Sequence, residues 1–373
     1  MKVLHLETGR HVYGGALQVL LLLEGLKARG VQGLLVAPRG SHVLAEAEAR
    51  GLPSRSLPMA GEGDILFPYR FRGLIRAEAP DLVHLHSRRG ADTLGGLGAL
   101  WAGVPTVLTR RVDNPEPEWA VAPKYRLFRQ VIAISGAIRR VLIRQGVPPE
   151  KIRLVHSALD GSLFRSPCDE GVLSREMDVP PRAPVVGMAA QFIPRKGHHT
   201  LLEAVPGILR EHPDTRFLLF GRGPLREEVR ERIRTAGLLG SVLLPGFRED
   251  LPTLLPCLNL LVHPATMEGL GVILLQAGAA GLPVVAARAG GIPEVVAHGS
   301  TGLLVPPGDP RALATAVNGL LSAPEEAEAM GRRARERVAS EFSVHRMVEG
   351  NLDVYREVLS ASADTGDDPA EPS

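Results

Sequence analysis

Short apolar runs alternate with longer amphipathic stretches along almost the whole chain, which is the pattern of parallel strands joined by crossover helices. The runs expected to form a first sheet are Val3–Leu6, Leu34–Ala37, Leu82–His86, Thr106–Thr109 and Val131–Ile134. Between these runs, apolar residues recur at helical spacing, for example after the Gly14-Gly15 pair and after Ser135, a suitable N-cap. The pattern predicts a doubly wound α/β domain.

The same alternation starts again in the second half of the chain. Its apolar runs are Val185–Gln191, Phe217–Phe220, Val242–Leu244, Leu258–His263, Val284–Ala287 and Gly302–Val305. Four prolines stand in residues 165–184, a composition typical of a hinge. The chain is therefore expected to contain a first domain at 1–165, a linker at 166–184, a second domain at 185–341, a helix at 342–359 that packs back on the first domain, and a disordered acidic tail at 360–373.

Composition narrows the class of protein. A length of 373 residues suffices for two hydrophobic cores. Only 4% of the residues are aromatic, so stacking platforms for nucleic acid are not expected.

The cysteines and the apolar runs bear on the compartment. Cys168 and Cys257 lie 89 positions apart and form no CxxC pair, which excludes a zinc ribbon or a redox motif and makes a reducing compartment the default expectation. No apolar run approaches the ~18 residues of a membrane span. A cytoplasmic enzyme is predicted.

Charge is distributed unevenly along the chain. The net charge is +2, but residues 1–160 hold 22 Lys and Arg against 14 Asp and Glu. This excess suits an anionic acceptor or peripheral contact with the anionic inner face of the cytoplasmic membrane, although a solvated arginine-rich surface would look the same in the sequence. The residues concerned are Arg70, Arg72, Arg76, Arg88, Arg89, Arg110, Arg111, Lys124, Arg126, Arg129, Arg139, Arg140 and Arg144.

Candidate chemistry follows the predicted strands of the second domain, where ligands bind in sheets of this kind. Arg195 and Lys196 come after the first of these strands and open a helix, so cations and helix-start amides would form an anion site. Gly221 and Gly223 end the next strand and would let a pyrophosphate or ribose approach the backbone.

A third segment follows the Leu258–His263 strand. It reads Glu268-Gly269-Leu270-Gly271 and starts a helix that carries Gln276. The glycines would expose amides at the helix start, while Glu268 would accept hydrogen bonds from hydroxyl groups.

Several common site types are excluded by spacing. Residues 9–15 lack the GxGxxG of a dinucleotide fold, and the chain contains no GxxxxGK[ST], so neither hydride transfer nor ATP hydrolysis is indicated. No paired aspartates that would hold a metal beside a diphosphate are found, and His84-x-His86 is interpreted as strand packing. No metal and no cofactor are expected.

Six blocks in the second half resemble the retaining glycosyltransferases of family four, which have the two-domain GT-B fold. The blocks read PRKGHHTLLEA, FGRGPL, LPGF, HPATMEGLGVILLQAGAAGLPVV, GGIPEVV and GLLVPPGD, in the family's order. Weaker similarity extends to Gly14-Gly15, DLVHLHS at 81–87 and the segment from Ala133 to Asp160. The resemblance implies two Rossmann-like domains facing each other across a cleft, and a sugar transfer from a nucleoside diphosphate donor.

The resemblance also implies roles for individual residues. Lys196 would neutralise the donor diphosphate, Glu268 would contact the transferred sugar, and the amides of Gly269, Leu270 and Gly271 would hold sugar or phosphate. Gly14 and Gly15 would let the backbone of the first domain approach the donor phosphates. Fixed cations and helix-start amides suit this reaction, because the leaving phosphate gains negative charge as the glycosidic bond breaks.

The sequence departs from the family pattern at four places. Gln276 replaces the second glutamate of the family's motif, and Gln191 replaces an arginine near the phosphate lysine. Arg111 stands where the family commonly has a histidine close to the sugar, which makes it a catalytic candidate together with Glu268 and Lys196. Ala158-Leu159 replaces the usual Asn-Gly before Asp160. His86 and Asp113 are the acceptor-side candidates.

The sequence thus predicts a retaining hexosyl- or pentosyltransferase that acts on a glycan or lipid-linked acceptor, in lipopolysaccharide or other cell-envelope glycan synthesis. Two alternatives remain open from the residues alone. One is a nucleotide-sugar epimerase or hydrolase on the same scaffold, and the other is a non-catalytic protein that binds sugar nucleotides.

Overall fold

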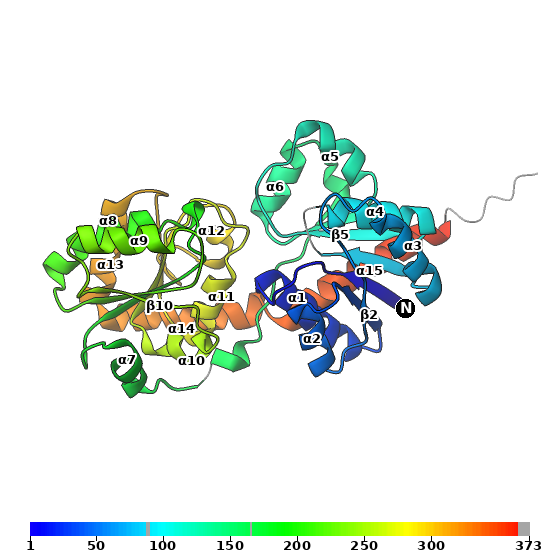
Figure 1. Cartoon of the computed structure of the whole chain (residues 1–373). Coiled ribbons are helices and arrows are strands. Elements are labelled where there is room, and N and C mark those ends of the chain that lie inside the picture. The colour runs from blue at the N-terminus through cyan, green and yellow to red at the C-terminus, as the bar shows by residue number, and fades with distance from the viewer. Residues whose placement is uncertain (87–89, 165, 365–373) are drawn as a thin grey trace, which may run out of the picture. The chain divides into compact units, whose positions relative to one another are not determined.

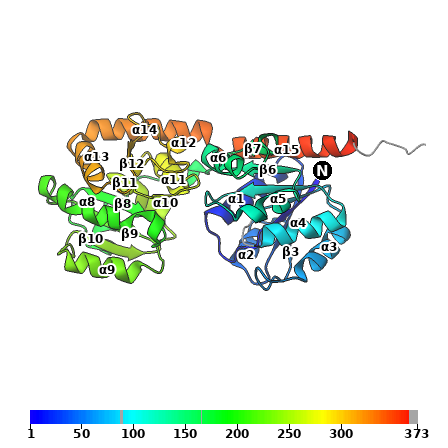
Figure 2. The same ribbon diagram turned by 90° about the horizontal axis from the view of Figure 1, so that it is seen from above.

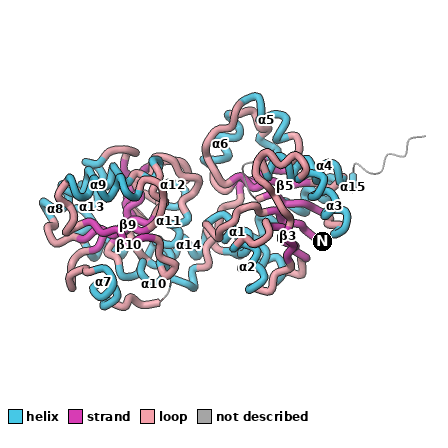
Figure 3. The backbone as a smooth tube through the Cα atoms, viewed as in Figure 1, coloured by secondary structure: helices cyan, strands magenta, loops and turns pink. Residues whose placement is uncertain are grey.

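The computed structural model describes residues 1–86, 90–164 and 166–364, which form two compact units (Figure 1). The first unit contains Met1–Ser157 together with the C-terminal segment that starts at Val344, and the second contains Ala158–Ser343. Each unit is built on one parallel sheet, visible as a group of magenta strands in Figure 3.

The sheet of the first unit has seven strands in the order β3-β2-β1-β4-β5-β6-β7. The strands are β1 (Lys2–Leu6), β2 (Gln32–Ala37), β3 (Ser54–Ser56), β4 (Leu82–Leu85), β5 (Thr106–Arg110), β6 (Gln130–Ala133) and β7 (Ile152–Leu154). The two edge strands, β3 and β7, were not among the predicted strands, because each has only three residues and neither forms an apolar run. The central strands are buried on both faces, as parallel sheets require.

Helices cover this sheet: α1 (Gly14–Lys27), α2 (His42–Ala49), α3 (Phe67–Glu78), α4 (Ala91–Ala102), α5 (Glu118–Tyr125), α6 (Gly136–Arg144) and a 3₁₀ turn at Pro149–Lys151. Helix α6 begins as predicted, since the Ser135 hydroxyl accepts a hydrogen bond from the Ile138 amide at 3.1 Å.

The C-terminal helix α15 (Val344–Asp364) belongs to the first unit although it follows the second in sequence (Figure 2). It packs against α1, and just after α1 the Arg29 Nε lies 2.5 Å from the Glu349 Oε1. It also reaches the sheet, since the Tyr355 hydroxyl lies 2.6 Å from the His84 Nδ1. The prediction that the tail is disordered from residue 360 is wrong for residues 360–364, which continue the helix, and residues 365–373 lie outside the described part of the chain.

The sheet of the second unit has six strands in the order β10-β9-β8-β11-β12-β13. They are β8 (Val185–Ala189), β9 (Arg216–Phe220), β10 (Val242–Gly246), β11 (Leu260–His263), β12 (Val284–Ala287) and β13 (Leu303–Val305). The helices are α7 (Glu170–Met177), α8 (His198–Glu211), α9 (Arg226–Thr235), α10 (Leu251–Leu254), α11 (Val272–Ala280), α12 (Ile292–Val295), α13 (Pro310–Ser322) and α14 (Pro324–Glu341), with 3₁₀ turns at Gly161–Phe164, Pro194–Lys196 and Leu255–Cys257.

Both sheets confirm the predicted doubly wound α/β fold. In each sheet the strand order reverses beside the first strand, between β1 and β4 in one unit and between β8 and β11 in the other. The loops after these two central strands leave the sheet in opposite directions, which opens a crevice at their carboxyl ends. The sequence candidates that follow β8 and β11 are therefore brought to one place.

The boundary between the units differs from the expected one. The first unit ends at Ser157, and residues 166–184 are not a linker but contain helix α7 of the second unit. Asp169 caps this helix by accepting a hydrogen bond from the Gly171 amide at 3.0 Å, and Leu173 and Met177 are buried. The prolines that suggested a hinge flank the helix and do not interrupt it.

A disulfide joins Cys168, just before α7, to Cys257. This pairing was not expected, because a bond between cysteines 89 positions apart has no signature in the sequence. The expectation of two reduced thiols is therefore wrong. The bond ties α7 to the turn before β11 and closes a long loop, which removes conformational entropy from the unfolded chain.

The disulfide generates a prediction about stability. Replacing Cys168 with serine should lower the free energy of unfolding of the second unit by ~2–4 kcal/mol, the usual effect of losing a native disulfide. Urea unfolding of both proteins without reductant measures this difference. Adding dithiothreitol should bring the unmodified protein down to the variant and leave the variant unchanged. Two titratable thiols in the denatured, unreduced chain would contradict the pairing.

Candidate functional site

The centre of the candidate site is an ion pair between Lys196 and Glu268. Lys196 ends the 3₁₀ turn after β8, and Glu268 lies in the loop after β11. The Lys196 ammonium contacts the Glu268 Oε2, and both side chains are only about one-eighth exposed, at 12% and 13%. The same carboxylate oxygen lies 2.9 Å from the Nε2 of His263, the last residue of β11. The neighbouring strands β8 and β11 thus bring together residues 72 positions apart in sequence.

The charges of this cluster are fixed by its surroundings. Burial alone would raise the pKa of Glu268, but the hydrogen bond from His263 and the Lys196 charge outweigh it and hold the pKa far below its usual range. Burial lowers the pKa of His263, so the neutral imidazole donates its Nε2 hydrogen to the carboxylate. The pKa of Glu268 is lower in the folded protein than in the unfolded chain. Its contribution to the free energy of unfolding is therefore complete above the pKa of the unfolded chain, and it is lost as the pH falls through the pKa of the folded protein.

Two helices begin at this ion pair without a side-chain cap. Helix α8 starts after Gly197, which has φ +78°, and a Cβ there would lie 2.1 Å from the Pro264 carbonyl oxygen. Helix α11 starts after Gly271, which has φ +94°. Neither helix carries an acidic residue in its first turn. The start of α8 follows Lys196, and a Cβ on Gly271 would lie 3.5 Å from the Glu268 Cγ. The positive ends of two helix dipoles therefore lie beside the ion pair, which favours binding of an anion.

The remaining predicted residues of the second unit surround this point. Arg195 is half-buried, and its guanidinium donates to the Met267 carbonyl at 3.3 Å, which links the loops after β8 and β11. Gly269 and Leu270 are buried, while Gln276 is half-buried on α11. The carboxamide of a glutamine can both donate and accept hydrogen bonds.

Gly221 and Gly223 have a structural reason to be glycine. A Cβ on Gly221 would lie 2.0 Å from the Ala190 carbonyl oxygen, and one on Gly223 would lie 2.6 Å from the Phe192 carbonyl oxygen. The loop after β9 thus packs backbone to backbone against the loop after β8. Close packing explains why both positions are glycine, and donor binding by Gly221 and Gly223 stays a prediction.

The candidates of the first unit lie at the carboxyl ends of β1, β4 and β5. Gly14 and Gly15 begin α1, and a Cβ on Gly15 would lie 3.5 Å from the Arg111 Cδ. The Arg111 guanidinium donates to the Ser157 hydroxyl at 3.4 Å. Burial lowers the pKa of Arg111 to about 10, although Glu7 opposes the shift, so the side chain remains cationic at neutral pH. Asp113 is half-buried in the loop that follows β5.

His86 belongs to a buried cluster with His5 and His84. The His5 Nδ1 lies 2.9 Å from the His86 Nε2, and one nitrogen of each ring lies within 4.8 Å of the others, a separation that a metal ion could use. However, His84 engages both of its nitrogens, with the Tyr355 hydroxyl and with the Thr109 hydroxyl at 2.7 Å. Burial lowers the pKa values of all three rings, which keeps them neutral. The cluster fits the expected strand packing.

Two of the cations expected to contact an anionic partner are paired inside the first unit. Arg110 and Lys124 point inward and share Glu116, with the Arg110 Nη1 at 2.8 Å and the Lys124 Nζ at 2.6 Å from its Oε1. Asp92 completes this internal network through Lys124. These two cations therefore do not form part of an exposed basic surface. Arg88 and Arg89 lie outside the described residues.

Two histidines of the second unit lie beside the candidate site residues in sequence. His198 is buried and stacks on Phe192 with ring centroids 4.3 Å apart. His263 was not singled out as a site residue. Its signal was its position, because a polar residue at the carboxyl end of a buried strand points to a site in a sheet of this type.

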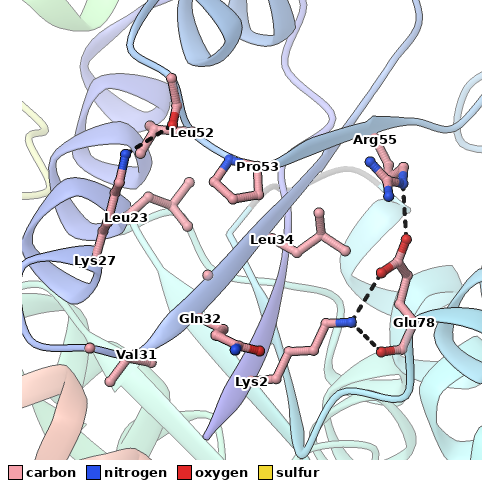
Figure 4. Close-up of a pocket in the computed structure, with 13 residues that line it drawn as sticks. Lys2, Leu23, Lys27, Val31, Gln32, Leu34, Leu52, Pro53, Arg55 and Glu78 are labelled. Atoms are coloured by element: carbon pink, nitrogen blue, oxygen red, sulfur yellow. Dashed lines mark hydrogen bonds and ion pairs between the residues drawn. The ribbon is translucent and has the colours of Figure 1, made fainter.

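A pocket of about 500 Å³ lies at the amino-terminal ends of strands of the first sheet, opposite the ends that carry the candidate residues (Figure 4). It is lined by the starts of β1 and β2 and by the end of α1. Its charges are satisfied internally, since Glu78 pairs with Lys2 at 3.0 Å and with Arg55 at 2.9 Å. The Lys27 ammonium donates to the Gly51 carbonyl at 3.1 Å. Because ligands of parallel sheets bind at the carboxyl ends of the strands, this pocket is not part of the candidate site.

Each of the two parallel-sheet units carries polar residues at the carboxyl ends of its central strands, where ligands bind in doubly wound folds. Residues 12–162 match the model of Glycosyltransferase Family 4, and residues 172–337 match that of glycosyl transferases group 1. The alpha-maltose-1-phosphate synthase of Mycolicibacterium smegmatis is 31% identical, over 76% of this chain and 80% of its own length. The chain belongs to the glycosyltransferases of family four.

Two further similarities bear on the fold and on possible substrates. The GDP-mannose-dependent alpha-(1-6)-phosphatidylinositol monomannoside mannosyltransferase of M. smegmatis is 37% identical, over 66% of this chain and 64% of its own length. The crystal structure of Anabaena HepE in complex with UDP and glucose superimposes with a TM-score of 0.84 at 24% identity, and the match covers 95% of this chain and 99% of that one. The second comparison confirms the GT-B fold.

The ion pair predicts an unusual effect of neutralising Glu268. In the structure the Glu268 carboxylate is paired with the Lys196 ammonium. A nucleoside diphosphate that binds at Lys196 would therefore compete with this carboxylate and be repelled by its negative charge. Glu268→Gln should therefore bind UDP or GDP at least about fivefold more tightly, as removal of ~1 kcal/mol of charge repulsion implies, while sugar transfer falls at least about a hundredfold. Isothermal calorimetry and a transfer assay measure the two effects.

Glu203→Gln provides the matched control, since Glu203 is exposed on α8. It should leave both binding and transfer unchanged. Weaker diphosphate binding by Glu268→Gln, or transfer equal to that of the unmodified protein, would show that Glu268 does not face the donor.

Proposed function

We propose that this protein transfers a sugar from a nucleoside diphosphate donor to an acceptor with retention at the anomeric carbon. The observation that carries the proposal is the Lys196–Glu268 pair at two uncapped helix starts. This place offers a cation and amides to a diphosphate and a carboxylate to a sugar. The UDP and glucose bound by Anabaena HepE support a nucleotide sugar as the donor.

The proposed chemistry follows from the charges at the site. When the glycosidic bond breaks, the leaving diphosphate gains negative charge and the sugar gains positive charge. Lys196, assisted by Arg195 and the first amides of α8, stabilises the phosphate, while Glu268 binds a sugar hydroxyl beside the reacting carbon. His263 holds Glu268 ionised and oriented, and Gln276 hydrogen-bonds the ribose. Because these groups already neutralise the diphosphate, we propose that the reaction needs no metal.

We further propose a glycan or lipid-linked acceptor, with cell-envelope or lipopolysaccharide assembly as the pathway. Arg111, His86 and Asp113 are the acceptor-side candidates in the first unit. The mannosyltransferase relative supports a lipid-linked acceptor, because its name specifies a phosphatidylinositol monomannoside. The positive balance of the first 160 residues suits an anionic acceptor and peripheral contact with an anionic membrane. No helix among the described residues is long and apolar enough to span a bilayer.

A thermal-shift panel of UDP-, GDP- and ADP-sugars tests donor binding, because a ligand at ~100 times its dissociation constant adds ~2.7 kcal/mol of stability. The stabilising donor is then incubated with candidate acceptors, and proton NMR of the first-formed product reads the anomeric configuration. An axial donor should give an axial product, with or without EDTA. An inverted product would contradict retention, and loss of transfer in EDTA would contradict metal independence.

Lys196 provides the direct mutational prediction. Lys196→Ala should lower kcat/KM by about a hundredfold to a thousandfold, the usual effect of removing one preorganised group that stabilises developing negative charge. The matched control is Arg210→Ala, which removes an exposed cation from the far end of helix α8, the helix that follows Lys196. The control should retain full activity. A change of less than about threefold in Lys196→Ala would remove Lys196 from the catalytic machinery.

A further inference from the structure

The start of helix α3 exposes apolar side chains that nothing in the described part of the chain covers. Ile65 is 78% exposed, Leu66 59% and Tyr69 61%. Trp101, at the end of α4, is 42% exposed and lies against Tyr69 with ring centroids 5.1 Å apart. Helices α3 and α4 lie side by side in Figures 1 and 2, and the Tyr69–Trp101 contact joins them. Ile65 and Leu66 directly precede α3 in sequence.

The exposed face of α3 continues from these apolar residues into arginines. Tyr69, Arg72 and Arg76 follow one another at helical spacing, whereas Phe71 and Ile75 on the other side of the helix are buried. We call the six residues Ile65, Leu66, Tyr69, Arg72, Arg76 and Trp101 the α3 face. It is apolar at the start of the helix, aromatic in the middle and cationic toward its end.

The charges on this face are not paired within the described part of the chain. Arg76 is exposed and Arg72 is half-buried, and neither forms an ion pair there. The neighbouring acids are already engaged, since Asp64 pairs with Arg70 at 2.5 Å and Glu78 pairs with Lys2 and Arg55. The face therefore presents net positive charge beside exposed apolar groups.

This combination distinguishes an anionic bilayer from other partners. Tyr and Trp prefer the headgroup level of a membrane, where their apolar rings are buried and their polar atoms stay hydrated. Aliphatic side chains next to them can enter the acyl boundary, while arginines meet lipid phosphates. A purely solvated basic surface would not need Ile65 and Leu66 exposed just before the helix start.

We propose that the α3 face docks the first unit on an anionic lipid bilayer, with Ile65 and Leu66 entering the acyl boundary and Arg72 and Arg76 contacting lipid phosphates. This inference deepens the proposed function, since it assigns a surface to the membrane contact that a lipid-linked acceptor would require. The docking itself needs neither donor nor acceptor. It can therefore be tested without any turnover.

Flotation of the full chain with vesicles tests the proposal. The protein should float with phosphatidylcholine vesicles that contain 30% phosphatidylglycerol, and at least about fivefold less with phosphatidylcholine alone or in 0.5 M salt. Leu66→Glu should lower the bound fraction at least fivefold. Leu239→Glu is the matched control, because Leu239 is 61% exposed but lies in the second unit, and it should float like the unmodified protein.

Fluorescence supplies a second readout, because the chain has only two tryptophans. Trp119→Phe leaves Trp101 as the single reporter on the α3 face. Its emission should shift to shorter wavelength on anionic vesicles and be quenched by lipids brominated near the headgroup. Circular dichroism melting of every variant separates lost docking from lost folding.

The proposal is overturned if the unmodified protein fails to float with anionic vesicles, if folded Leu66→Glu floats equally well, or if the Trp101 emission does not move. In those cases a positive nucleotide-sugar panel would leave the transferase assignment intact. Conversely, docking without any donor binding would retain the α3 face and reject the proposed donor site.

Discussion

The candidate site depends on one constraint, which is that a buried carboxylate must be paired. Glu268 is almost enclosed by protein, and an isolated charge in that environment would bind a proton instead of remaining ionised. Lys196 and His263 keep it charged, and all three residues are placed by the ends of two neighbouring strands. The strand order of the sheet thus determines the electrostatics. Without the pairing of β8 with β11, the two loops that carry the cation and the acid would lie apart.

The pairing also explains how a site can be strongly charged and yet stable before substrate arrives. The carboxylate compensates Lys196 in the free protein, and the uncapped starts of α8 and α11 add partial positive charge without adding further ions. In the proposed reaction, an incoming diphosphate would replace one anionic partner of Lys196 by another. The released carboxylate would then be available to a hydroxyl of the sugar, so a single exchange of partners would prepare both halves of the donor.

Patterns of local sequence predicted most of this arrangement. The long apolar runs identified the central strands, and the glycines and cations after them identified Lys196, Arg195 and Glu268 as neighbours. The misses have common physical causes. Strands β3 and β7 are too short to show a period, and the Cys168–Cys257 bond joins distant segments that no local pattern connects. His263 was missed because burial of a polar ring is decided by tertiary packing.

The first unit carries a different set of properties from the second. Its polar residues at the strand ends include the half-buried Arg111 and the histidine cluster, while its exposed α3 face is apolar and cationic. The central claim, however, concerns Lys196. A crystal structure of the protein with a bound nucleoside diphosphate tests it most directly: the account predicts a phosphate oxygen within hydrogen-bonding distance of the Lys196 Nζ and at the first amides of α8. A diphosphate bound elsewhere, with the Lys196–Glu268 pair still closed, would contradict it.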